Sequence, residues 1–292
     1  MIIVTGTKRS GTSMWMQILG AAGFPVFGEA FPKEWGTTIR DANPNGFFES
    51  LLRRGIYYKT NPHPRTGHYF FPEQVERYAV KVFIPGLVRS DRAFIGRVIA
   101  TMRPWREYEA SLSRLYAMED ESRGRPSLPR LPAHLEWWVE NFSLIRDIAT
   151  RRYPVHAQSY PSLLRDPEKV IRETLRWIGD GDVEAAVAAV KPENRTQKEV
   201  KSESFDVHMA GLCDELYDRI DRRKPLDANF IQALNDGDAR IAPELQRAYE
   251  TVMRAREEAR AASESEEGDA PGLSAMALEV STETDDPQPS TR

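Results

Sequence analysis

Short apolar runs rich in β-branched residues alternate along this chain with longer segments of helical periodicity. Four of these runs predict strands, at residues 2–5, 79–84, 97–101 and 155–159. The other segments predict helices, at residues 13–22, 105–118, 132–152, 167–178, 183–190 and 242–261. Because strands and helices alternate, we expect an α/β fold with a central parallel sheet of four or five strands flanked by helices. Extra helices are expected near the C-terminus.

A change of composition divides the chain into two parts. Residues 262–292 are rich in Ser, Glu, Asp, Thr and Pro and carry almost no large apolar side chains. Such a segment cannot bury enough surface to offset the conformational entropy that folding would cost. We therefore expect a folded domain at residues 1–261, followed by a disordered acidic tail at residues 262–292.

The acidic tail conceals the charge of the folded part. The whole chain has a net charge of −4, but residues 263–292 hold eight acidic side chains and one basic side chain, so the remainder carries +3. A mildly basic domain suits an anionic ligand. It falls far short of the positive charge of nucleic-acid-binding domains, so we expect no nucleic-acid partner.

Cysteine content and apolar run length exclude several classes of protein. The single cysteine, Cys213, excludes a disulfide framework and a multi-cysteine zinc site. No apolar run reaches the roughly 18 residues that a membrane span needs. The N-terminus reads as a strand entering a loop rather than as a signal peptide. These features predict a cytoplasmic protein without an integral membrane segment.

The strongest candidate site is the loop between the first predicted strand and helix, Gly6-Thr7-Lys8-Arg9-Ser10-Gly11-Thr12-Ser13. Its glycines allow the backbone to turn tightly and approach a ligand. The following helix offers free N–H groups and the positive end of its dipole to an anion. In ATP and GTP sites a lysine follows the second glycine. Thr12 occupies that position here, which argues against such a site.

Arg9-Ser10-Gly11-Thr12-Ser13 resembles the 5′-phosphosulfate loop of the sulfotransferases that use 3′-phosphoadenosine 5′-phosphosulfate (PAPS), which reads K/R-S-G-T-[ST] after a strand. The resemblance implies a three-layer, P-loop-like fold, with PAPS as sulfuryl donor, its bisphosphate PAP as product, and no metal. It implies that the backbone amides of the loop hold the 5′-phosphate and that Arg9 contacts the bridging oxygen, with Lys8 adding charge. Met14 stands where cytosolic members carry the tryptophan that stacks on adenine, and Trp15 follows it.

Two later segments resemble further motifs of the same family. Residues 97–101 lead into Met102-Arg103-Pro104, with Ser111 eight residues after Arg103, which is the spacing of the family's 3′-phosphate motif. An arginine at the end of a strand and a serine on the next helix can grip one phosphate from two sides. Ser159-Tyr160-Pro161 resembles the segment whose tyrosine lies near the nucleotide. Arg195 stands where members bring a late basic residue to the 3′-phosphate.

The acceptor side of the site needs a base for the acceptor's proton. The cytosolic members carry K-T-H-L-P, and the matching stretch here runs from Lys81 to Pro85 with Phe83 in place of the histidine. The resemblance therefore implies that Lys81 contacts the transferred sulfuryl group or the phosphate bridge, but it does not identify the base. Residues 43–50 resemble a bacterial N-P-x-G-[YF]-[FW]-E segment, which makes Glu49 the candidate base and His63 or His68 the alternatives.

The sequence thus predicts transfer of a sulfuryl group from PAPS to a hydroxyl, in preference to an amine, of a small-molecule, lipid or glycan acceptor. Two other functions stay open: a small-molecule kinase with a modified phosphate loop, and a non-catalytic protein that binds PAP or PAPS. A homodimer is compatible with the sequence. His63 and His68 do not form a metal-ligand pattern, so no metal is expected.

Overall fold

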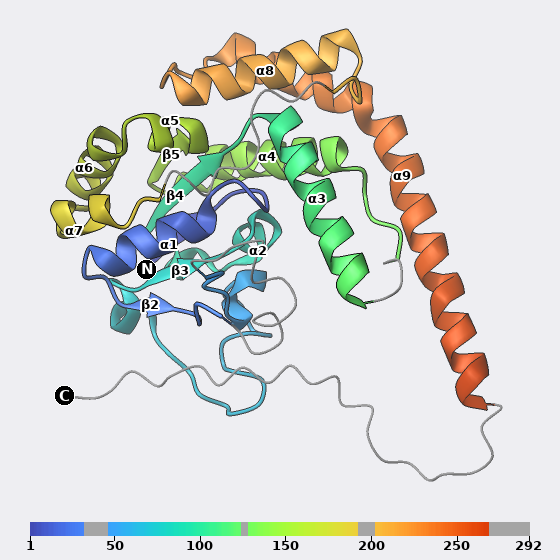
Figure 1. Ribbon diagram of the computed structural model, residues 1–292, viewed down its shortest axis with the longest axis horizontal. Helices are drawn as coiled ribbons and strands as arrows, with labels where there is room; N and C mark the ends of the chain where they lie inside the picture. Colours follow the sequence, from blue (N-terminus) through green and yellow to red (C-terminus); the bar gives the residue numbers. More distant parts are fainter. Residues whose placement is uncertain (32–45, 124–127, 192–201, 269–292) are drawn as a thin grey trace.

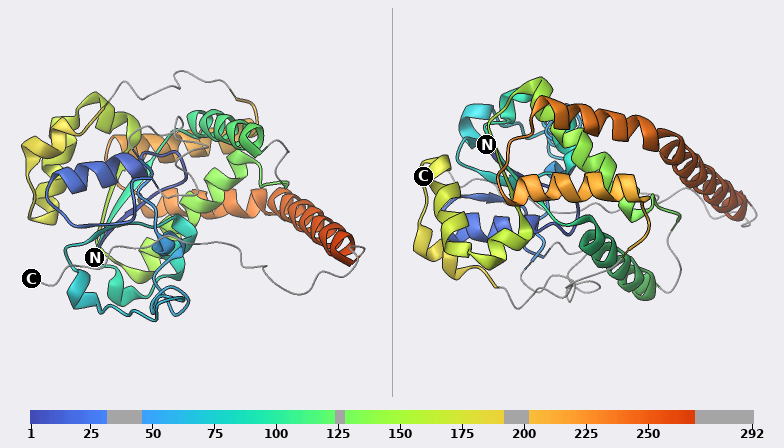
Figure 2. Two further views of the ribbon diagram at one scale, coloured as in Figure 1. Left: turned by 60° about the horizontal axis from the view of Figure 1, so that its bottom comes forward. Right: turned by 90° about the horizontal axis from the view of Figure 1, so that it is seen from above.

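The computed structural model describes residues 1–31, 46–123, 128–191 and 202–268. It has the α/β fold that the hydrophobic pattern predicts, with a five-stranded parallel sheet between two layers of helices (Figure 1). A further group of helices, α3, α8 and the long α9, lies beside this three-layer body and gives the molecule its elongated outline (Figure 2).

The strands of the sheet are arranged in the order β2-β3-β1-β4-β5. β1 (Ile2–Thr5) lies at the centre, with β3 (Ala79–Lys81) on one side and β4 (Arg97–Met102) on the other, and the edges are β2 (Val26–Phe27) and β5 (Val155–Ser159). The chain first builds the sheet on one side of β1 and then on the other. In open parallel sheets, ligands bind at the carboxyl ends of the strands where the order reverses, which here is the end of β1.

The two faces of the sheet are covered by different helices because successive side chains of a strand point to opposite faces. Ile2 and Val4 pack into an apolar cluster with α1 (Thr12–Ala21), α5 (Tyr160–Arg165), α6 (Pro167–Ile178) and α7 (Val183–Ala188). Ile3 points the other way, into a cluster with α2 (Ile84–Arg89) and part of α4 (Ala133–Arg151).

A third apolar cluster lies outside the sheet and joins α3 (Trp105–Arg123) and α4 to α8 (Val207–Asp221) and α9 (Ala228–Gly268). Its largest members are Trp105, Trp137 and Trp138, all of them fully buried. The core role that tryptophans at such positions usually have is therefore observed here. This cluster attaches the C-terminal helices to the end of the sheet at which the candidate site lies.

Most differences between the predicted and observed elements lie at element ends. The predicted strand at residues 79–84 ends at Lys81, because Pro85 stands in the first turn of α2, where proline favours a helix. The predicted helix at residues 105–118 continues to Arg123. β2, α5, α8 and the short 3-10 helices were not predicted; the last are η2 (Leu51–Arg54), η3 (Pro72–Val75) and η4 (Arg92–Phe94).

The last helix is much longer than the predicted 242–261. α9 begins at Ala228, passes through Pro243 and ends at Gly268. Phe230, Leu234 and Ile241 bury one face of its first half against α4 and α8, and this burial outweighs the helix-breaking tendency of Pro243. α9 also extends past residue 261, the expected end of the folded domain, and residues 269–292 of the expected tail lie outside the described residues.

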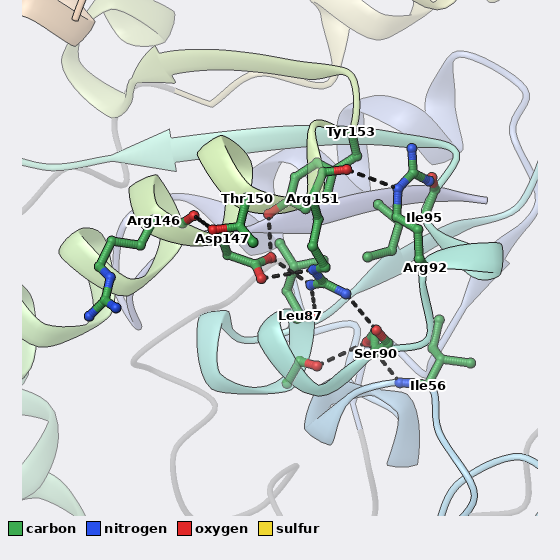
Figure 3. A network of polar contacts seen from close by, with 11 residues as sticks. Ile56, Leu87, Ser90, Arg92, Ile95, Arg146, Asp147, Thr150, Arg151 and Tyr153 are labelled. Atoms are coloured by element: carbon green, nitrogen blue, oxygen red, sulfur yellow. Dashed lines mark hydrogen bonds and ion pairs between the residues drawn. The ribbon is translucent and has the colours of Figure 1, made fainter. Parts of the chain in front are cut away.

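A polar network ties α4 to α2 on the face of the sheet opposite α1 (Figure 3). The Arg151 guanidinium donates to the carbonyl oxygens of Leu87 and Ser90, each at 2.7 Å, and to both carboxylate oxygens of Asp147. Tyr153 donates its hydroxyl proton to the same carboxylate at 2.8 Å. Arg151 therefore gives two carbonyl oxygens at the end of α2 a charged donor, and the Leu87 carbonyl oxygen also accepts the Ser90 N–H.

Substitution of Arg151 by methionine is expected to lower the free energy of unfolding by about 2–4 kcal/mol. The change removes the charged donor of the Leu87 and Ser90 carbonyl oxygens and the cation that pairs with Asp147, while Leu87 keeps the Ser90 N–H and Asp147 keeps the Tyr153 hydroxyl. Arg146→Met, one turn earlier at an exposed position, is the matched control and should stay within about 0.5 kcal/mol of the wild type. Equal urea midpoints for the two variants would show that the network adds nothing to stability.

Candidate anion-binding site

The loop after β1 packs closely against the end of β4. Gly6 has a φ of +154°, and a Cβ atom there would lie 2.3 Å from the backbone oxygen of Thr101, so only glycine fits. The Ser10 hydroxyl donates to the Thr7 carbonyl oxygen at 2.6 Å, and the Thr101 hydroxyl donates to the Ser10 carbonyl oxygen at 2.8 Å. Because these groups are buried, the loop has a fixed shape before any ligand arrives.

The first turn of α1 is open to an anion. Gly11, at the N-cap, has a left-handed φ of +99°, and a Cβ atom there would meet the Tyr160 ring at 2.5 Å. No side chain caps this end of the helix, and no acidic residue stands in its first turn. The N–H groups that begin the helix therefore have no side-chain acceptor, and Thr12 and Ser13 add hydroxyl groups beside them.

Arg9 brings together residues from distant parts of the chain. Its Nε donates to the Ser111 hydroxyl oxygen at 3.2 Å, and Nη1 of Arg103 donates to the Arg9 carbonyl oxygen at 3.2 Å. Burial, together with the nearby positive charges of Arg103 and Arg114, lowers the pKa of Arg9 to about 10. Among the described residues, no carboxylate lies within ion-pairing distance of the Arg9 guanidinium.

Arg103 is held rigidly at the end of β4. It is buried, and its Nε lies 3.2 Å from a carboxylate oxygen of Glu107, one helical turn along the chain. Its guanidinium lies 5.3 Å from the centre of the Tyr160 ring. Arg9, Arg103, Ser111 and Tyr160 therefore come together at the carboxyl edge of β1, β4 and β5, where the sequence predicted that they would surround a nucleotide.

A buried ion pair lies on the other side of the loop. Lys81, at the end of β3, and Glu49 are 2% and 4% exposed, and their charged atoms are 3.0 Å apart. The second carboxylate oxygen of Glu49 lies 2.8 Å from Nη1 of Arg53. Lys81 also donates to the Ser13 hydroxyl at 3.2 Å and to the Phe47 carbonyl oxygen. Burial lowers the pKa of Lys81, and Glu49 opposes that shift.

This arrangement places Glu49 in contact with the anion loop through Lys81 and Ser13. Glu49 pairs with Glu29 in an isolated bridge, two residues before η2. Its carboxylate is clamped between two cations.

Lys8 points away from the rest of the predicted phosphate contacts. Its Nζ lies 3.2 Å from a carboxylate oxygen of Glu136 and 3.4 Å from the Tyr116 hydroxyl. Burial alone would lower the pKa of Lys8, but Glu136, Tyr116 and Glu140 more than reverse this and raise it. Lys8 thus connects the loop to α3 and α4, so its predicted role as a phosphate contact is not supported by its position in this structure.

Glu136 and Glu140 form a second acidic group, one turn apart on α4. Burial, followed by the charge of Glu136, raises the pKa of Glu140 to about 8, while Lys8 acts in the opposite direction. One oxygen of the Glu140 carboxyl group is buried and has no hydrogen-bond partner among the described residues. Two acids thus share one lysine, and Glu140 keeps its proton at neutral pH.

The remaining predicted site residues lie elsewhere. The Met14 side chain belongs to the apolar cluster beneath α1, as does that of Trp15, so neither side chain is offered to an adenine ring. Met14 was predicted among the cofactor-binding residues because of its place after the loop, and its side chain lies in the core instead. His63 and His68 contact each other through their backbones in a surface loop, and His63 Nδ1 accepts from the Thr66 N–H. Arg195 lies outside the described residues.

Sequence reasoning missed two residues that pair with predicted ones. Arg53 and Glu107 each stand four residues after their partners, Glu49 and Arg103, and an opposite charge at this spacing is a signal that could have identified them. The buried Glu140 was missed as well and gave no such signal, because its burial depends on how α3 and α4 pack.

Neither a metal-binding group of side chains nor a membrane-spanning helix is found among the described residues. No group of three or more His, Cys, Asp or Glu side chains among them is placed to hold a metal ion. None of the helices in the described part of the chain is both long and apolar enough to cross a bilayer.

Comparisons with known proteins find similarity only at the level of solved structures. No family model matches the sequence, and no curated protein matches it. Among solved structures, the chain is similar to the sulfotransferase domain from the Synechococcus PCC 7002 olefin synthase, with 14% sequence identity and a TM-score of 0.36. The match covers 81% of this chain and 93% of that domain.

Proposed function

We propose that this protein is a sulfotransferase that takes a sulfuryl group from PAPS and passes it to an acceptor hydroxyl. The observation that carries the proposal is Arg9, a partly buried cation that lies beside two further arginines and has no carboxylate partner among the described residues. A positive site of this kind is stabilised by a bound anion.

The arrangement suits an anion with phosphate groups at two places. One group would be held by the first turn of α1 and Arg9, and the other by Arg103 and Ser111. These residues come from loops about 90 residues apart in the sequence and meet at the carboxyl ends of adjacent strands. Tyr160, packed between Gly11 and Arg103, offers a ring at the same place for the nucleoside.

The chemistry requires positive charge at the bond that breaks and a base at the bond that forms. PAPS would supply the sulfuryl group, which passes between two oxygen atoms with dispersed negative charge. Arg9 and Lys81 lie on either side of the helix N-terminus and would stabilise that charge. Glu49, bonded to Lys81, would accept the acceptor's proton.

Thermal stability in the presence of nucleotides tests the donor assignment. Adenosine 3′,5′-bisphosphate at 100 times its dissociation constant should stabilise the protein by about 2.7 kcal/mol, and adenosine 5′-phosphate should stabilise it less. Ser111→Ala should weaken the preference for the bisphosphate, because Ser111 positions Arg9. Ser113→Ala, at an exposed position on the same helix, is the matched control.

Two other outcomes would change the assignment. Stabilisation by ATP with Mg²⁺ and none by the bisphosphate would reject PAPS and favour the kinase alternative. Selective binding of the bisphosphate without release of it from PAPS, over a panel of phenols, alcohols and amines, would favour a non-catalytic nucleotide-binding protein.

A further inference from the structure

A surface loop at residues 57–71, here called the aromatic loop, is exposed but is held in place at its base by hydrogen bonds and ring contacts. The buried Asn61 side chain pins its two ends together: Nδ2 donates to the Phe70 carbonyl oxygen at 2.9 Å, and Oδ1 accepts from the Phe70 N–H at 3.2 Å. The Phe70 ring packs against Phe27 and Phe94 in the core. The base of the loop is therefore fixed to the body, and Figure 1 shows the loop on the opposite side of the molecule from α8.

The aromatic loop exposes large rings that a folded chain ordinarily buries. Tyr58 is 78% exposed, Phe71 54% and Tyr69 45%. Because the contact between Asn61 and Phe70 brings the two ends of the loop together, residues 57–60 and 69–71 lie side by side. The exposed rings therefore form two pairs, Tyr57 with Tyr58 and Tyr69 with Phe71, on the two joined ends of the loop, and exposed apolar surface of this kind marks an interaction site.

Between Glu49 and Glu73, the sequence that contains the aromatic loop carries only positively charged side chains. Residues 50–72 include four basic side chains, Arg53, Arg54, Lys59 and Arg65, and no acidic one. Arg53 is paired with Glu49, whereas Arg54, Lys59 and Arg65 are exposed. The next acidic residue along the chain is Glu73. The loop thus combines exposed rings with an excess of positive charge.

We propose that the aromatic loop docks the protein on an anionic lipid surface. Tyrosine and phenylalanine rings settle at the boundary between head groups and acyl chains, and nearby lysine and arginine side chains bind anionic head groups. This attachment is peripheral and goes beyond the proposed function, on which it does not depend.

Two observations favour a lipid surface over a nucleic acid or another polyanion. The chain outside the acidic tail carries only +3, too little for a polyanion-binding domain. The rings also meet edge to face, with interplanar angles of 81° between Tyr69 and Phe71 and 85° between Tyr57 and Tyr58. Single-stranded nucleic acids need flat ring faces on which successive bases stack. An edge-to-face cluster does not form such a platform, but it can insert into a lipid interface.

Cosedimentation of the full-length chain with vesicles tests the proposal. We expect binding to vesicles that contain one-third phosphatidylglycerol, weak binding to pure phosphatidylcholine, and loss of binding at high salt. Tyr58→Ser/Phe71→Ser and Lys59→Gln/Arg65→Gln should each weaken binding by about tenfold or more. All four positions are exposed, so melting temperatures near that of the wild type will show that the variants are folded.

Matched controls come from α9, which exposes similar side chains away from the loop. Tyr249→Ser/Met253→Ser and Arg247→Gln/Arg254→Gln should leave vesicle binding unchanged. Three results would overturn the proposal: no vesicle binding by the wild type, binding that the loop variants keep, or binding to heparin or RNA homopolymers in place of vesicles. The last result would assign the loop to a polyanion.

Discussion

Glu49→Gln is expected to lower kcat for sulfuryl transfer by about 10²–10⁴-fold, the usual effect of losing a general base. It is also expected to lower the free energy of unfolding by about 3 kcal/mol, because it leaves the buried Lys81 ammonium without its carboxylate partner. Activity is measured as release of adenosine 3′,5′-bisphosphate from PAPS with an acceptor that the wild type sulfates. Stability is measured by urea denaturation, and activity is assayed well below the melting temperature of the variant.

The double variant Glu49→Gln/Lys81→Met separates the two effects. It removes both charges of the buried pair, so most of the lost stability should return. Activity should stay low because both the base and the cation beside it are absent. Glu73→Gln, at an exposed position, controls for the loss of a glutamate and should match the wild type in both measurements.

A different pattern would assign Glu49 another role. If Glu49→Gln keeps wild-type activity at a temperature where it is folded, Glu49 serves only as the partner of Lys81 and Arg53. The two charged contacts of its carboxylate would then be structural, and the base would have to come from another residue.

The central sheet and the meeting of the glycine-rich loop with Arg103 could be predicted because their signals are local. A glycine-rich loop between a strand and a helix determines its own geometry, and the positions of Gly6 and Gly11 matter through their positive φ angles. The parallel sheet then brings the ends of β1 and β4 together. This is why Arg9 and Arg103 meet although each was identified in a separate motif.

The positions of the Lys8 and Met14 side chains depend on tertiary contacts, which local sequence patterns do not show. Lys8 is next to Arg9 in sequence, but its partner, Glu136, stands 128 residues later on α4. Met14 follows the loop directly, yet the direction of α1 points its side chain into the core. Both predictions treated neighbours in the sequence as neighbours of the ligand, whereas successive residues at a helix start point in different directions.

The C-terminal helices illustrate the same limit for the fold. Pro243 and the polar residues before it obscure the helical pattern of α9, whose buried face becomes visible only when α4 and α8 are present. Gly237 fits closely there, since a Cβ atom would lie 2.4 Å from the Leu212 side chain. Tertiary burial thus determines a helix that propensity alone does not predict.

Glu140→Gln is expected to stabilise the protein at neutral pH by about 3 kcal/mol. The folded protein raises the pKa of Glu140 to about 8, whereas an ordinary glutamate has a pKa of 4.5. Between these values the folded state keeps a proton that the unfolded state has released. Stability therefore falls as pH rises, by about 1.4 kcal/mol per pH unit, until the pH passes the folded pKa. Glutamine has no proton to lose and removes this penalty.

The measurement is the free energy of unfolding from urea titrations between pH 5 and pH 9. Burial and the charge of Arg223 lower the pKa of His156, so His156 makes stability rise with pH below about 6.5, where the unfolded histidine titrates. The difference between the variant and the wild type cancels this contribution and isolates Glu140. It should grow with pH up to about 8 and then level off.

Glu257→Gln on the exposed surface of α9 is the matched control and should show no pH-dependent difference from the wild type. A flat difference for Glu140→Gln as well would mean that Glu140 is ionised throughout and that Lys8 serves both Glu136 and Glu140. A difference that grows with pH would establish that Glu140 holds a proton in the folded protein. The charge next to the anion loop would then change near pH 8, and bisphosphate affinity in the wild type should fall there because a second negative charge appears close to the bound anion.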